Sequence, residues 1–104
     1  MHGRVATYTY TGDALDIARK AEEGILPILR TQPGFKAYSV FATDAKIISF
    51  SAWETAEAAE AANTTVADWV AQNLADEVEL QKSHIGEIYF STALGVSTRD
   101  RVTA

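Results

Sequence analysis

The side chains of this sequence that could do chemistry are a carboxamide, an indole, a histidine and several phenols. Asn63 and Trp69 lie in the segment 55 to 74, where apolar residues recur at spacings of three and four. Both residues therefore fall on one broad face of a predicted helix. A buried carboxamide without a partner costs about 1 to 3 kcal/mol, so Asn63 needs hydrogen bonds. A histidine such as His84 can act as a base near neutral pH.

The run Asn63, Thr64, Thr65 interrupts an alanine-rich stretch and has two interpretations. In the first, the helix bends here and Thr65 caps a second segment, with Asp68 as the acidic partner of a capping box. In the second, the small alanines leave a gap between helix and sheet, and Asn63 and Trp69 line it. Such a pocket would have an apolar wall and a polar handle, as small-molecule sites usually do.

Composition excludes several classes of function. The 104 residues suit a single domain, with a core at about 4 to 93 and a tail at 94 to 104, and the net charge of −5 comes without a basic cluster that could bind nucleic acid. There are no cysteines, and the two histidines lie far apart without acidic neighbours at helical spacing, so we expect no metal site. No stretch has the length of a membrane span, and we expect a cytoplasmic protein.

The periodicity of the chain predicts six elements. Strands alternate in side-chain character and are rich in β-branched and aromatic residues, whereas helices show the three-and-four spacing. "QPGF" predicts a type II turn with Gly34 at positive φ, Asp13 a helix N-cap, and "TDAK" a hairpin loop. The acid-rich "ADEVELQ" is typical of a solvated face or a loop boundary. The predicted order is strand 4 to 10, helix 14 to 31, strand 35 to 42, strand 46 to 53, helix 55 to 74 and strand 84 to 93.

This order is β-α-β-β-α-β, the ferredoxin-like arrangement of an α+β protein. It places both helices on one face of a four-stranded antiparallel sheet. The strands nevertheless carry apolar side chains on both faces, for example Ile47 and Trp53 on one and Ile48 and Phe50 on the other. A second copy of the chain is the simplest cover for the remaining face, so we expect a homodimer that packs sheet against sheet.

With "PGF" after the first helix and "SAWETAEAAEAAN" leading into the second, the chain resembles the antibiotic biosynthesis monooxygenase-like members of the dimeric α+β barrel superfamily over about 4 to 93. The resemblance implies a homodimeric barrel with a pocket between sheet and helices. It further implies oxidation of a small aromatic phenol or hydroquinone by molecular oxygen, with no bound cofactor. A haem-degrading branch uses an Asn on its first strand, which is absent here, so haem is not expected.

Such a reaction would need groups that hold the ring, bind oxygen atoms and accept or relay a proton, and the chain offers candidates for each role. Asn63 would hydrogen-bond a substrate carbonyl, Trp69 would face the ring, and His84 would act as the base, and these form the expected catalytic set. The alternatives to these catalytic roles are structural: Trp69 would only pack in the core, and His84 would lie in a solvated polar loop. The expected substrate-binding residues, some of which could relay a proton or only pack across a dimer, are Tyr8, Tyr38, Trp53 and Tyr89.

A different class of function stays open, namely a non-catalytic dimeric barrel that binds a small hydrophobic ligand. The two functions differ in what must point into the cavity. An oxygenase needs hydrogen-bonding or ionisable groups there, whereas a binding protein can be lined by alanine, isoleucine, valine and tryptophan alone. The orientation of Asn63 is therefore the deciding feature.

Overall fold

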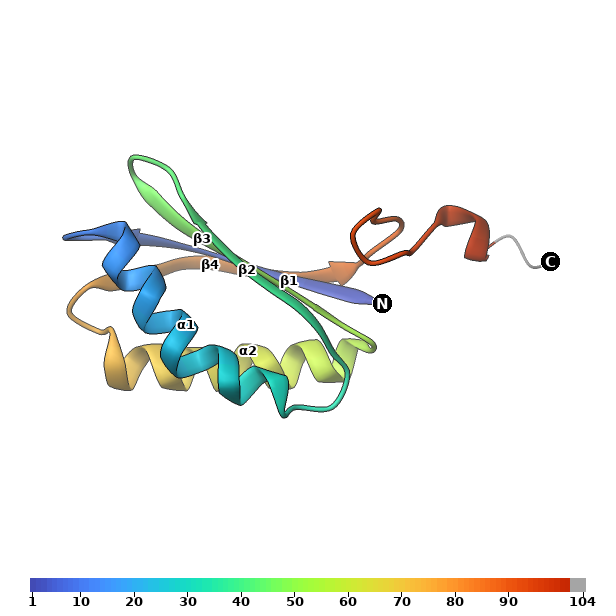
Figure 1. The fold of residues 1–104 in the computed structure, drawn as a ribbon, viewed down its shortest axis with the longest axis horizontal. Helices are drawn as coiled ribbons and strands as arrows, with labels where there is room; N and C mark the ends of the chain where they lie inside the picture. The colour runs from blue at the N-terminus through green and yellow to red at the C-terminus, as the bar shows by residue number, and fades with distance from the viewer. Residues whose placement is uncertain (102–104) are drawn as a thin grey trace.

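A computed structural model describes residues 1–101. The strands form one antiparallel sheet in the order β2-β3-β1-β4, and both long helices lie on the same face of it (Figure 1). This arrangement confirms the predicted β-α-β-β-α-β fold. The elements are β1 (His2–Tyr10), α1 (Ala14–Arg30), β2 (Phe35–Ala42), β3 (Lys46–Trp53), α2 (Ala56–Asn73), β4 (Val78–Glu87) and the short 3-10 helix η1 (Thr98–Arg101).

The local signals that start and end α1 work as expected. The Asp13 side chain accepts a hydrogen bond from the Leu15 backbone N–H at 3.2 Å, which satisfies one of the free donors at the helix N-terminus. The helix ends in the predicted turn, where Gly34 has a φ of +83° and the Phe35 N–H donates to the Gln32 carbonyl at 3.4 Å. These contacts turn the chain directly into β2.

β1 lies at the centre of the sheet, between β3 and β4. Its alternation buries Arg4, Ala6 and Tyr8 on the face that carries the helices, and leaves Val5 and Thr7 half-buried on the other face. The charged side chain of Arg4 therefore points to the face of β1 that forms the core. Burial of an arginine is rare unless it is paired, so its surroundings need explanation.

The prediction of the last strand at 84 to 93 is wrong, because β4 begins six residues earlier and ends at Glu87. β4 pairs only with β1 and forms an edge of the sheet, with nearly all its side chains exposed. An edge strand does not need the apolar alternation that identifies buried strands, so the polar "VELQKS" was not recognisable. His84 consequently lies inside β4 rather than in a loop at its entry.

The prediction of a helix break at 63 to 65 is also wrong, because α2 runs without interruption from Ala56 to Asn73. The Thr64 and Thr65 hydroxyls donate to the carbonyls of Glu60 and Ala61 one turn earlier, at 3.4 and 3.0 Å. Thr65 also accepts a hydrogen bond from Gln32 at 2.6 Å, which ties α2 to the end of α1. The polar run is thus accommodated within one helix.

Within residues 1–101, one face of the sheet carries no helix, and the chain after β4 leaves the sheet. Phe41 on that face is 55% exposed, and the segment 88–101 projects beyond the N-terminal end of β1 (Figure 1). Ser91 and Val96 form an isolated bridge within this segment. Residues 102–104 of the predicted tail lie outside the described part of the chain.

Candidate functional site

The buried Arg4 meets Asn63 between the sheet and α2. Arg4 is 1% exposed, and its Nε donates to Asn63 Oδ1 at 2.7 Å. None of the ion pairs found in residues 1–101 includes Arg4, and its buried Nη1 has no hydrogen-bond partner there. An arginine remains charged in proteins, so a cation is buried here against a neutral amide and no carboxylate.

The hydrogen bond from Arg4 fixes the orientation of the Asn63 amide. Because Oδ1 accepts from Nε, the Nδ2 group points its two donors elsewhere. Within the described residues, Nδ2 donates to no other group and is not buried without a partner. Asn63 therefore keeps two N–H donors free for a molecule next to α2.

Such a space exists beside the pair. A groove of about 290 Å³ runs between α2 and β4, and we call it the α2–β4 groove. Asn63, Ala67 and Ala71 recur every four residues and line one side of it from α2. The methyl side chains are too short to fill the space between helix and strand. The complete lining is Arg4, Tyr8, Asn63, Ala67, Val70, Ala71, Ala75, Val78, Glu79 and Leu80.

The space at the centre of the protein is much smaller than the α2–β4 groove. The cavity between the helices and the middle of the sheet measures only about 30 Å³, enough for about one water molecule. Tyr8, Tyr38 and Trp69 line it, and so does Ser49, whose buried hydroxyl has no partner among the described residues. Tyr8 lines this cavity and the α2–β4 groove, and so connects them.

Trp69 closes the gap between the two helices. Its indole lies directly against Gly24 of α1, so that a methyl group at position 24 would overlap the ring. Trp69 does not line the α2–β4 groove with Asn63, although the sequence places both residues on one broad helix face. The structure thus separates the two residues that were expected to share a pocket.

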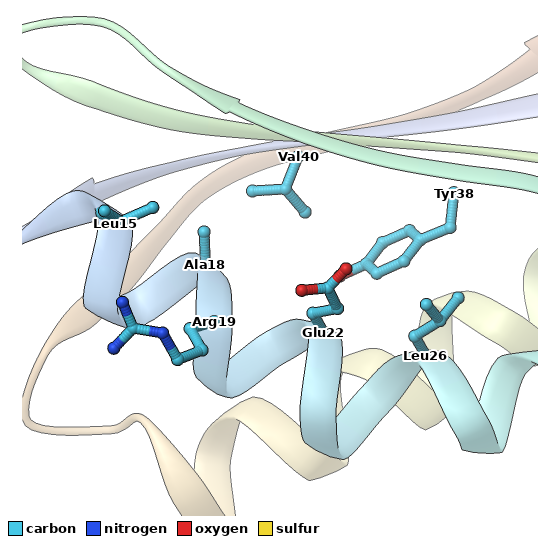
Figure 2. A pocket seen from close by; sticks show the side chains of 7 residues that line it. All are labelled: Leu15, Ala18, Arg19, Glu22, Leu26, Tyr38 and Val40. Atoms are coloured by element: carbon cyan, nitrogen blue, oxygen red, sulfur yellow. The ribbon is translucent and has the colours of Figure 1, made fainter.

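A second groove, of about 300 Å³, lies at the opposite edge of the sheet between α1 and β2, and we call it the α1–β2 groove. Figure 2 shows Tyr38 and Val40 reaching into it from β2, with Glu22 extending toward Tyr38 from α1. Burial raises the pKa of Tyr38 to about 12, an effect that Tyr8 increases and Arg4 opposes. Tyr38 is therefore a protonated phenol at neutral pH. The lining is Leu15, Ala18, Arg19, Glu22, Leu26, Tyr38 and Val40.

The other expected site residues lie outside both grooves. Trp53 is fully buried, donates from Nε1 to Ser51 Oγ at 2.9 Å, and packs edge to face on Phe35 at 5.5 Å. His84 is exposed on β4, opposite Val5 on the face of the sheet that has no helix. Tyr89 is exposed beyond the end of β4. None of these three residues lines the α2–β4 groove with Asn63.

Sequence reasoning missed Arg4, although a signal for it existed. In β1 the alternate positions Ala6 and Tyr8 face the core, and Arg4 lies two positions before them on the same face. A charged residue at a core-facing position is rare, so it signals a special role. What the pattern alone could not supply was the partner, since Asn63 lies 59 positions along the chain.

The described residues contain no group of three or more His, Asp or Glu side chains that could hold a metal ion. Over the same residues, no helix is both long and apolar enough to cross a membrane.

Comparison with known proteins gives a consistent fold. No family model and no curated protein matches the sequence. Among solved structures, SnoaB from Streptomyces nogalater, described as a cofactor-independent oxygenase, is similar at a TM-score of 0.68 and 14% identity, over 88% of this chain and 95% of that one. The ActVA-Orf6 monooxygenase of Streptomyces coelicolor, in complex with Nanaomycin D, is similar at 0.64 and 19% identity, over 86% and 92%.

A structure described as an antibiotic biosynthesis monooxygenase is similar at a TM-score of 0.61 and 15% identity, over 88% of this chain and 99% of that one. These identities are low, so the likeness lies in the arrangement of helices and strands. The chain has the fold of the antibiotic biosynthesis monooxygenases, as the resemblance in its sequence predicts.

Proposed function

We propose that the protein is a cofactor-independent monooxygenase that oxidises a small aromatic phenol or hydroquinone bound in the α2–β4 groove. The observation that carries this proposal is the Arg4–Asn63 hydrogen bond, which leaves the two Nδ2 donors of Asn63 available beside an apolar groove. Oriented donors at the edge of an apolar space can stabilise negative charge that develops on a substrate. The shared fold with SnoaB and ActVA-Orf6, both described as oxygenases, supports the same assignment.

In the proposed reaction the substrate supplies the electrons. The phenol loses a proton, and the electron-rich anion then reduces oxygen; one oxygen atom enters the ring, which is oxidised to a quinone, and the other leaves as water with the two hydrogen atoms lost from the substrate. Asn63 holds the substrate oxygen through Nδ2, and the alanines of α2 provide a flat apolar wall for the rings. Tyr8 lines the groove and the inner cavity, and in this proposal it relays the proton. The proposal gives no role to His84, Trp53 or Tyr89.

Trp69 and Tyr38 have indirect roles in this proposal. Both line the small inner cavity beside Tyr8, but neither lines the α2–β4 groove. We expect Trp69 to hold α1 and α2 together across Gly24. We expect the phenol of Tyr38 to stay protonated, so that it adds no charge to the inner cavity.

Oxygen uptake by purified protein, without added metal or cofactor, tests the function against a panel of phenols and hydroquinones. We expect turnover by the wild type and a loss of about 100-fold in Asn63→Ala, the usual effect of removing one oriented donor. Asn73→Ala is the matched control, because Asn73 is on the same helix but outside the groove, and its side chain donates to the Trp69 carbonyl. No uptake with any compound, or equal turnover in Asn63→Ala, would contradict the proposal.

The alternative is a barrel that binds a hydrophobic ligand without chemistry, and the apolar walls of the same groove favour it. Valine, leucine and alanine side chains account for most of the lining. Binding of an aromatic probe with no oxygen uptake across the panel would support this alternative.

The proposal includes a homodimer in the cytoplasm. The face of the sheet without helices carries Val5, Ile48, Phe50 and the exposed Phe41, an apolar surface that a second copy could cover. The projecting segment after β4 adds exposed Tyr89 and Phe90, which could contact the partner. Light scattering at micromolar concentration should give twice the mass of the chain, and a monomeric mass would contradict this part. The absence of cysteine suits a reducing compartment.

A further inference from the structure

Among the described residues, Arg4 is the one charged side chain buried in the core, and it has no ion-pair partner there. Removing a cation from water costs several kcal/mol unless an anion or a full set of hydrogen bonds compensates. Arg4 has one hydrogen bond of 2.7 Å, to a neutral amide, while Nη1 is buried and unpartnered among the described residues. A purely structural residue at this position would be apolar, so the burial of this charge points to a ligand.

The location of Arg4 indicates where that ligand lies. Arg4 lines the α2–β4 groove beside Asn63, and the rest of the lining is apolar except for Tyr8 and Glu79. Glu79 is exposed on β4 and forms no ion pair with Arg4. The groove thus combines one uncompensated positive charge with walls of alanine, valine and leucine.

We infer that Arg4 binds an anionic oxygen of an aromatic ligand through Nη1 and thereby makes the α2–β4 groove selective for anions over neutral molecules of the same shape. The inference rests on the proposed function for the identity of the groove, and it names the group that holds the oxyanion once the phenol has lost its proton. A guanidinium and an amide side by side can bind one oxygen or the two oxygens of a carboxylate. The negative charge of the ligand is therefore that of a phenolate or of an aromatic carboxylate.

Matched pairs of unreactive probes test the inference by calorimetric titration. The carboxylate pair is 2-naphthoate and 2-naphthamide, and the phenolate pair is 4-nitrophenol, at a mildly alkaline pH where it is ionised, and its neutral methyl ether. We expect one anion at least to bind about 10- to 100-fold tighter than its neutral partner, the usual value of a charged hydrogen bond. The anion with the larger preference identifies the source of the charge. Equal binding within both pairs would overturn the inference.

Substitution of Arg4 separates anion binding from a structural role. In Arg4→Met the preference for the anion should fall to within about threefold, while binding of the neutral probe stays unchanged, and Arg4→Lys should retain part of the preference. A parallel loss for both members of a pair would mean that Arg4 only orients Asn63, and would overturn the inference. Arg30→Gln is the control for net charge, because Arg30 is exposed at the end of α1, outside the groove.

A second variant tests the inference if Arg4→Met does not fold. Arg4→Met combined with Asn63→Leu removes both partners of the hydrogen bond and leaves no unpaired amide, so it should fold, and although both probes of a pair bind more weakly, they should bind equally, with no preference for the anion. Persistent anion preference in this double variant would overturn the inference.

The test also distinguishes this inference from the proposed function. Anion preference that depends on Arg4, without oxygen uptake from any phenol, would support the inference and contradict the oxygenase. Oxygen uptake that survives in Arg4→Met, with no anion preference in the wild type, would do the reverse.

Discussion

The α2–β4 groove and the α1–β2 groove lie at opposite edges of one sheet and have nearly the same volume, about 290 and 300 Å³. They differ in where their charges lie. In the first, a cation is buried at the sheet without a counter-ion, whereas in the second Arg19 and Glu22 are exposed on α1 and the partly buried group is the neutral phenol of Tyr38 (Figure 2). Charges in water cost little, so only the first groove contains polar chemistry that a ligand must explain.

The comparison shows that volume alone does not identify a site in a small α+β protein. Both grooves arise because two helices cannot cover a four-stranded sheet to its edges. The edge strands β2 and β4 are left partly open on the helical face. What distinguishes the grooves is the desolvation of a charged group, and this can be tested by filling or neutralising each groove separately.

Filling the two grooves should have the largest effect. Ala71→Leu adds three carbon atoms at an exposed position of the α2–β4 groove and should weaken aromatic ligand binding by about 10- to 100-fold, with little change in stability. Leu15→Trp fills the α1–β2 groove from an exposed position and should leave binding unchanged. Titration of both variants with one aromatic ligand checks this, and the opposite pattern would exchange the roles of the grooves.

The helix contact between the grooves should give the next largest effect. Gly24→Ala forces a methyl group into the Trp69 ring and should lower the free energy of unfolding by about 1 to 3 kcal/mol. With Trp69→Leu already present, the same substitution should instead stabilise the helix by up to about 1 kcal/mol. Urea unfolding of the four proteins forms a double-mutant cycle. Equal effects of Gly24→Ala in both backgrounds would show that the contact does not hold the helices together.

The partly buried phenol of Tyr38 should produce a moderate dependence of stability on pH. Burial favours the neutral form of Tyr38 and raises its pKa to about 12, so its contribution to stability is complete below pH 10, the ordinary value, and is lost as pH rises toward 12. Tyr38→Phe has no proton to lose and should show a flatter decline between these values. Urea unfolding at several alkaline pH values measures the difference. Parallel curves for wild type and variant would contradict the assignment.

The exposed charges of the α1–β2 groove should matter least. Glu22→Gln and Arg19→Gln each remove a charge that water already solvates, although Arg19 forms a surface ion pair with Asp16 at 3.5 Å. We expect changes of less than about 0.5 kcal/mol in stability and less than twofold in oxygen uptake. A larger loss of activity in Glu22→Gln would move the chemistry to this groove.

The sequence predicts the fold well where local physics decides the outcome. Asp13, the Pro33–Gly34 turn and the alternation of β1 to β3 each act over a few residues, and all are found as expected. β4 was misplaced because an edge strand owes its position to backbone pairing with β1 rather than to an apolar pattern.

The candidate site was half predictable. Asn63 was recognised because a carboxamide among apolar residues requires a partner, and the deciding question, whether it faces a cavity, is answered by its place in the α2–β4 groove. Its separation from Trp69 could not be predicted, because a helical wheel does not say which part of a broad face lies over the sheet edge and which lies against α1. Arg4 was detectable as a charged residue at a core-facing position of its strand, but it was not detectable as the partner of Asn63.

The most direct test of the central claim, that the α2–β4 groove is the ligand site, is a titration of ¹⁵N-labelled protein with 2-naphthoate followed by NMR. We predict the largest shift changes at the Arg4 Nε–H signal and at the backbone amides of Ala67, Ala71 and Leu80. The largest changes at Leu15 and Leu26 of the α1–β2 groove, with an unaffected Arg4 Nε–H, would contradict it.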